Sequence, residues 1–224
     1  MMGHLRHLQN YEIVIVCDDS GSMLTPIDDT RRTRWDELRD IVKIILKIGV
    51  VFDTNGVDVY FLNREPILRV KDPQMVDQTF ENPPRGYAPM VPLLTSIFQS
   101  PLARRGRDKK LLVFIVTDGE PTDDHGNPNV EELKNIMTNI RNAETTYVSF
   151  LICTDDAACV EYLNEWDRQM IHVDVTDNFH VERKKVRRYS GQDYRFSHGD
   201  YIIKALAGSI VPEIDALNEP SINE

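Results

Sequence analysis

The feature that most constrains the fold of this chain is a set of short apolar runs that do not alternate with polar residues. Strands are expected over Glu12–Cys17, Lys110–Val116 and Tyr147–Cys153, whose interior positions are almost all apolar. Strands of this kind are buried on both faces and are typical of parallel sheets covered by helices. A further short strand is expected at Ile171–Val175. The runs therefore predict a parallel sheet with helices on both sides.

Segments with the helical period alternate with these strands. The first helix is expected to start near Thr33, because Thr33 and Asp36 have the spacing of a capping box. Its apolar residues recur every three or four positions, so one face can pack on a sheet. The polar stretch Thr176–His198 is expected to be a long excursion. Further helices are expected at Pro92–Ser100, Asn129–Asn142, Asp155–Gln169 and about His198–Leu217.

One pair of strands is expected to be antiparallel. Val57–Leu62 and Ile67–Val70 are separated by residues 63–66, which are too few for a crossover helix. The predicted fold class is therefore a doubly wound, Rossmann-like α/β fold with a mostly parallel sheet of about six strands and one antiparallel edge strand. With no internal repeat or linker in view, residues 1–224 are expected to form a single domain with its core at about 11–217.

Composition excludes several classes of partner. The 224 residues carry a formal net charge of −10, which argues against a nucleic-acid binder. No apolar run is long enough to span a membrane, and the N-terminus lacks the apolar core of a secretory signal. We therefore expect a cytoplasmic monomer without nucleic-acid or membrane partners. The three cysteines cannot all pair, and reduced thiols are the expectation.

Two acidic loops indicate where a ligand could bind. Asp18, Ser20 and Ser22 follow the first expected strand directly, and Asp118 follows the strand Lys110–Val116. In a doubly wound sheet these two strands are neighbours, and ligands bind at their carboxyl ends where the strand order reverses. Carboxylate and hydroxyl oxygens suit Mg²⁺, or alternatively Mn²⁺ or Ca²⁺. The sequence thus predicts a metal site made of Asp18, Ser20, Ser22 and Asp118.

With these two loops the chain resembles the von Willebrand factor A (vWA) domain, over roughly 11–217. The match is to the metal-ion-dependent adhesion site, through Asp18-x-Ser20-x-Ser22 and Asp118 in a Thr-Asp-Gly loop. The resemblance implies that both serines bind the ion directly and that the carboxylates bind it directly or through water. It also implies that a partner protein offers an Asp or Glu side chain to the remaining position.

A third loop departs from the family pattern, which reads Gly-Gly-Thr-Pro-Leu with the threonine as a metal ligand. The corresponding stretch 86–90 retains Gly86 and Pro89 but has Ala88 at the threonine position, and an alternative alignment puts Val91 there. Thr95 is expected inside the following helix. Because switching members of the family exchange an aspartate bond for the threonine bond, the resemblance implies a weak or single-state site with water in the gap.

Other charged groups near these loops have simpler interpretations. Asp19, Glu120, Asp123 and Asp124 are expected to be solvated charges at the rim of the site. The basic stretch 104–110 is expected to be a solvated connection. A second basic stretch, 183–188, could also be solvated, or could dock an acidic partner or a phosphate.

These observations favour a non-enzymatic protein-interaction module. No nucleophile–base pair is in evidence, so no catalytic residue is predicted; Cys17 is discounted because acidic neighbours raise a thiol pKa. One alternative is a Mg²⁺-dependent phosphatase similar to the haloacid dehalogenases, although Ser20 stands where those enzymes carry a second aspartate. The other alternative is a vWA scaffold that works without metal.

Overall fold

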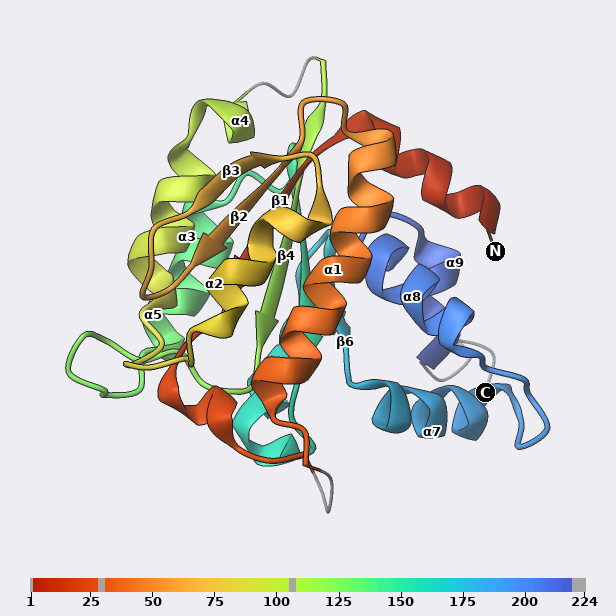
Figure 1. Cartoon of the computed structure of the whole chain (residues 1–224). Helices are drawn as coiled ribbons and strands as arrows, with labels where there is room; N and C mark the ends of the chain where they lie inside the picture. The colour runs from red at the N-terminus through yellow and green to blue at the C-terminus, as the bar shows by residue number, and fades with distance from the viewer. Residues whose placement is uncertain (1, 28–30, 105–107, 219–224) are drawn as a thin grey trace.

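The computed structural model describes residues 2–27, 31–104 and 108–218 (Figure 1). Its centre is a six-stranded sheet in the order β3-β2-β1-β4-β5-β6, with β2 and β3 antiparallel and the other neighbouring pairs parallel. This confirms the predicted fold class. The strands are β1 (Tyr11–Cys17), β2 (Val57–Phe61), β3 (Ile67–Val70), β4 (Lys110–Thr117), β5 (Thr146–Ile152) and β6 (Val173–Thr176).

Both faces of the sheet are buried, as the continuous apolar runs predict. In β1, Ile13 and Ile15 pack into the cluster that includes Leu38 of α1 and Leu206 of α8. Val14 faces the opposite cluster, which contains residues of α3, α5 and α6. Figure 1 shows α1 and α8 side by side over one face, with α3 behind the sheet. Strand β1 therefore lies in the interior, and its carboxyl end opens at the edge where the acidic loop begins.

The helices are shorter and more numerous than the periodicity predicts. Helix α1 begins after Thr33, and the predicted capping box is confirmed: the Thr33 hydroxyl accepts from the Asp36 amide, and the Asp36 carboxylate accepts from the Thr33 amide. The bounds are α1 (Arg34–Phe52), α2 (Asp77–Glu81), α3 (Met90–Gln99), α4 (Pro101–Arg104), α5 (Val130–Asn135), α6 (Glu161–Gln169), α7 (Phe179–Ser190), α8 (His198–Ala207) and α9 (Pro212–Asp215).

Two helical predictions need correction. The polar stretch Thr176–His198, which was expected to be a long excursion, contains the regular helix α7, in which Glu182 and Val186 are buried. A mostly charged helix has a weak apolar period, so its pattern was easily missed. The expected terminal helix ends early, at Ala207, and Pro212 starts the separate helix α9. Helix α5 also turns into a π-helical segment, Ile136–Ile140.

Short 3-10 segments complete the described chain. The first, η1 (Met2–Asn10), packs on α8 and α1 and buries Leu8 completely. None of the described helices is long and apolar enough to cross a membrane. The other 3-10 segments are η2 (Gly21–Leu24), η3 (Pro73–Val76), η5 (Ala157–Val160) and η6 (Ala216–Asn218).

Candidate metal centre

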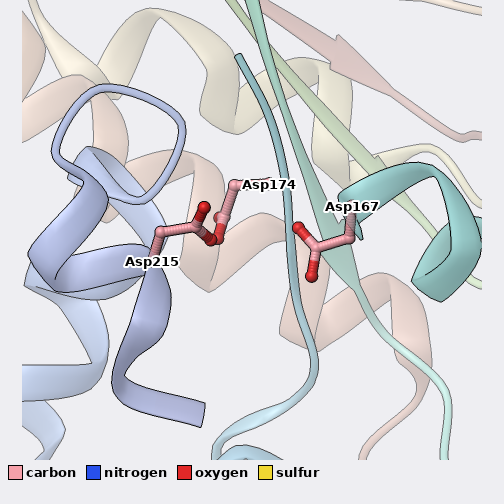
Figure 2. A group of neighbouring side chains, drawn as sticks. All are labelled: Asp167, Asp174 and Asp215. Carbon is pink, nitrogen blue, oxygen red and sulfur yellow. The ribbon is translucent and has the colours of Figure 1, made fainter. Parts of the chain in front are cut away.

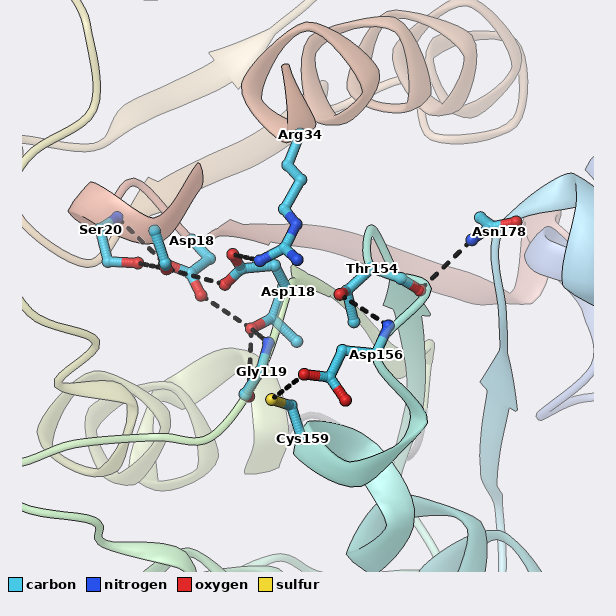
Figure 3. A network of polar contacts seen from close by, with 11 residues as sticks. Asp18, Ser20, Arg34, Asp118, Gly119, Thr154, Asp156, Cys159 and Asn178 are labelled. Carbon is cyan, nitrogen blue, oxygen red and sulfur yellow. Dashed lines mark hydrogen bonds and ion pairs between the residues drawn. The ribbon is translucent and has the colours of Figure 1, made fainter. Parts of the chain in front are cut away.

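The two acidic loops meet, as predicted, because β1 and β4 are neighbours in register. Cys17 pairs with Val116, and the ladder continues one residue further through a 2.9 Å hydrogen bond from the Asp18 amide to the Val116 carbonyl. Asp18 and Asp118 each lie just beyond the end of their strand, and the strand order reverses between β1 and β4. Figure 3 shows the two carboxylates facing one another there.

Three of the four predicted ligands bring oxygen atoms into direct contact. The Ser20 and Ser22 hydroxyl oxygens are 3.0 Å apart, and the Ser22 hydroxyl donates to Asp118 Oδ1 over 2.9 Å. Two oxygens at about 2.1 Å from an octahedral Mg²⁺, on adjacent positions, lie about 3 Å from each other. The Ser20–Ser22 and Ser22–Asp118 spacings therefore match the distance between adjacent ligands of an octahedral cation.

The fourth predicted ligand, Asp18, is a buried carboxylate beside a second one. It is 2% exposed, and its pKa is raised to about 6 by burial and by the negative charge of Asp118. The Ser20 amide and the Thr117 hydroxyl donate to its two oxygens, at 3.0 and 2.7 Å, and so orient it. Two carboxylates held together against their repulsion are an arrangement that a cation stabilises.

A positive charge within the chain also reaches this site. Arg34 Nη1 lies 2.7 Å from Asp118 Oδ2, so one oxygen of Asp118 faces Ser22 and the other faces a guanidinium. Arg34 is the first residue of α1, where the capping box at Thr33 sets its position. Nothing in the sequence pattern indicated this pair, because its partners are 84 residues apart and come together only through packing of α1. Arg34 is thus a site residue that sequence reasoning missed.

Asp19, which was expected to be a solvated charge at the rim of the site, has a structural role. Asp19 is completely buried, accepts from the Asn63 amide at 2.8 Å, and lies 2.9 Å from Arg64 Nε. It joins the first loop to the turn after β2, so the expectation of a solvated Asp19 was wrong. Glu120 and Asp124 are exposed, as expected. Asp123 is half-buried and accepts from the amides of its own loop.

The third loop is held against the first but contributes no side-chain oxygen. The Gly21 amide donates to the Gly86 carbonyl at 3.0 Å, and Gly86 has φ of +93°, with Asn63 Oδ1 only 2.8 Å from where a Cβ would stand. Ala88 is buried, and its amide donates to the Thr122 hydroxyl at 2.8 Å. The Thr95 hydroxyl lies in α3 and donates to the Val91 carbonyl. The threonine hydroxyl of the family pattern therefore has no replacement from these residues.

The cysteines have the predicted free thiols. Cys17 and Cys153 are buried, and burial together with Asp19 and Asp18 raises the pKa of the Cys17 thiol well above its usual value. Cys159 lies in the 3-10 segment η5, directly before α6, and its thiol donates a hydrogen bond to the Asp156 carboxylate at 3.3 Å (Figure 3). A thiol with a raised pKa is a poor nucleophile at neutral pH.

A second group of carboxylates, Asp167, Asp174 and Asp215, lies outside this centre, with oxygens within 4.8 Å of one another (Figure 2). The negative charge of Asp174 is already compensated. Lys204 Nζ lies 3.0 Å from Asp174 Oδ1, and both side chains are fully buried. Burial and the Asp174 charge raise the pKa of Asp215 to about 9, so Asp215 holds a proton at neutral pH. The cluster is a structural ion pair, which the sequence reasoning also missed.

No family model matches this sequence, and no curated protein matches it. Among solved structures it is similar to the pilus adhesin SpaC from Lactobacillus rhamnosus GG, at 13% identity and a TM-score of 0.44, covering 74% of this chain and 28% of that one. It is also similar to proximal thread matrix protein 1 from the mussel byssus, at 13% identity and a TM-score of 0.44, covering 77% of this chain and 45% of that one. The chain thus spans less than half of either protein.

Proposed function

We propose that this chain is a protein-interaction module of vWA type that binds its partner through a divalent cation held by Asp18, Ser20, Ser22 and Asp118. The observation that carries the proposal is the contact of the Ser20, Ser22 and Asp118 oxygens at 2.9–3.0 Å, beside the buried Asp18 carboxylate. Mg²⁺ at this position would neutralise the two carboxylates and leave an outer position for an Asp or Glu of the partner.

The surface around the centre supports a protein partner. Leu24, at the end of the first loop, is 49% exposed, and Tyr87, in the third loop, is 53% exposed. Large apolar side chains that flank a polar centre can be buried when a partner docks, whereas a small-molecule site is usually concave. We therefore propose binding of a protein surface and no catalysis, including no phosphatase activity.

The third loop supports a single affinity state. A second metal arrangement would need a hydroxyl in the place of Ala88, and the nearby Thr122 hydroxyl is already bonded to the Ala88 amide. Without that ligand the ion has one protein arrangement, completed by water. We propose that the module binds without the ligand exchange of switching family members.

Metal binding is tested by titrating the chain with Mn²⁺, using calorimetry and the electron paramagnetic resonance signal of free Mn²⁺. The wild type is expected to bind one ion, and Ser22→Ala is expected to raise Kd at least about tenfold because one direct ligand is lost. Ser96→Ala, an exposed serine on α3, is the matched control and should leave Kd unchanged. An undiminished free Mn²⁺ signal with wild-type protein would contradict the metal proposal.

A metal-free scaffold is the second candidate, and Arg34 is the observation that favours it. Its guanidinium lies 2.7 Å from Asp118 Oδ2 and supplies positive charge where a cation would otherwise do so. In that case the loop architecture persists without an ion, and a chelator leaves partner binding intact. Loss of partner binding on addition of a chelator would exclude this candidate.

Removing the Arg34 charge is expected to tighten Mn²⁺ binding. In Arg34→Gln, Asp118 no longer has a competing charge-assisted bond, which is typically worth about 1.5–3 kcal/mol, so we expect Kd to fall by about ten- to a hundredfold. Arg39→Gln removes the same charge from a more exposed position on α1 and serves as the control. Equal Kd values for Arg34→Gln and wild type would show that Arg34 does not compete with the ion.

A further inference from the structure

Part of the basic stretch 183–188 lines one wall of a groove in the C-terminal half of the chain. The groove has a volume of about 450 Å³ and lies between α6 and α7. Helix α6 contributes Asn164 and Arg168, and α7 contributes Lys185, Arg188 and Tyr189. Lys185 and Arg188 are the cationic residues of α7 that line this groove, whereas Arg187 donates to the Tyr194 carbonyl and Arg183 has a buried Nε.

Two of the three cationic side chains that line the groove have no ion pair or hydrogen bond within the described residues. Lys185 is bound to Asp177 and to the Asn164 side chain. Arg168 and Arg188 are exposed, and neither makes an ion pair or hydrogen bond with another residue in the described part of the chain. Arg188 lies over the ring of Tyr189, 5.8 Å from its centroid, and this stacking leaves the guanidinium edge open.

The carboxylates near the groove are not paired with the Arg168 and Arg188 guanidinium groups. Asp167 lines the wall of the groove, but its Oδ1 accepts a 3.0 Å hydrogen bond from the Val175 amide and so links α6 to the edge strand β6. Glu161 lies in the first turn of α6, about two turns from Arg168 along the helix, and Glu165 stands one turn before Arg168 without forming an ion pair with it. The lining residues of the groove thus include three cations and two carboxylates, and the two unpaired guanidinium groups give it a small excess of positive charge in a protein of net charge −10.

We infer that this groove binds an acidic segment of a partner polypeptide, with Arg168 and Arg188 each contacting a carboxylate. Guanidinium groups match carboxylates in a planar, two-bond geometry. A volume of about 450 Å³ exceeds that of one small anion and accommodates several side chains. The half-exposed Tyr189 (40%) and the Asn164 amide supply stacking and hydrogen bonds to a peptide backbone.

A polypeptide fits this surface better than an anionic membrane does. A membrane-binding helix presents large apolar residues beside its cations, whereas the exposed large hydrophobic residue of α7 among those described is Tyr189. The surface is also a groove, and such a shape accommodates an extended chain better than a flat bilayer. The inference does not depend on the metal centre, because none of its residues is a metal ligand.

The test uses the full chain in the presence of EDTA, so that the metal centre does not take part. The probe is a fluorescent polyglutamate peptide of about ten residues, which is long enough to cross the groove when extended. Its anisotropy is expected to rise on binding, while a polyglutamine peptide of equal length is expected to bind at least about tenfold more weakly. Binding should weaken steeply with added salt, because the contacts are at the surface.

Two variants distinguish binding of the peptide in the groove from non-specific electrostatic attraction to the protein surface. Arg168→Gln combined with Arg188→Gln is expected to raise Kd for polyglutamate at least about tenfold, and both residues are exposed, so the fold should persist. Lys184→Gln removes one charge from the exposed side of the same helix and is expected to change Kd less than about twofold. A Kd raised equally by Lys184→Gln would overturn the groove, and binding to phosphatidylserine vesicles in place of the peptide would overturn the polypeptide ligand.

Discussion

Lys204→Met is expected to lower the free energy of unfolding by about 3–5 kcal/mol, the usual cost of leaving one member of a buried ion pair without its partner. Lys204 on α8 and Asp174 on β6 are both fully buried, 3.0 Å apart. Burial alone would lower the pKa of Lys204, but the Asp174 and Glu182 charges more than offset it, so the lysine stays charged. Methionine keeps the volume and removes the charge.

Urea unfolding at neutral pH measures this cost. Lys47→Met makes the same replacement at an exposed position of α1 and is expected to change the free energy of unfolding by less than about 0.5 kcal/mol. In the double variant Lys204→Met with Asp174→Asn, the orphaned charge is removed, so the loss should be about 1–3 kcal/mol smaller than the sum of the single losses. Additive single losses would show that the two charges do not stabilise one another.

Gly208→Ala is expected to destabilise the protein by about 3 kcal/mol, at the upper end for overpacking. A Cβ at Gly208 would stand 2.3 Å from Asp174 Cγ, closer than any real contact. The backbone at Gly208 is helical, with φ of −55°, so the cost is steric and arises from the approach of α8 to β6. The added methyl group must push α8 outward and stretch the contact between Lys204 and Asp174.

The same replacement elsewhere on α8 provides the control. At Gly199 the nearest atom to an added Cβ is the Ser197 hydroxyl oxygen at 3.5 Å, an ordinary contact. Gly199→Ala is therefore expected to leave stability unchanged or raise it by up to about 1 kcal/mol through helix propensity. Urea unfolding of both variants decides the point, and similar free energies for Gly199→Ala and Gly208→Ala would show that α8 is not pressed against Asp174.

The α/β architecture was predictable because its signals are local. Continuous apolar runs identify β1, β4 and β5 as strands buried on both faces, and the short turn after β2 identifies the antiparallel edge. Capping at Thr33 was also visible as residue spacing. Helix α7 was missed because charge dominates its surface and leaves few apolar positions to mark a period.

At the candidate metal centre, the predicted ligands were correctly placed together, since parallel neighbouring strands end at the same edge. The sequence could not show that Arg34 reaches Asp118, or that Asp19 is buried between Asn63 and Arg64. These partners come from the start of α1 and from the turn after β2. Only the packing of those elements on the sheet brings them to the first loop.

The sequence by itself determined the main strands, their burial and which carboxylate and hydroxyl side chains follow the two central strands, because strand-end chemistry and apolar periodicity depend on neighbouring residues. The tertiary structure decided which charges are compensated. Arg34 forms an ion pair with Asp118, and Lys204 forms one with Asp174. Arg168 and Arg188 line the groove between α6 and α7 without an ion pair to another described residue. Coulombic interactions depend on distance in space and on burial, and neither quantity can be read from separation along the chain.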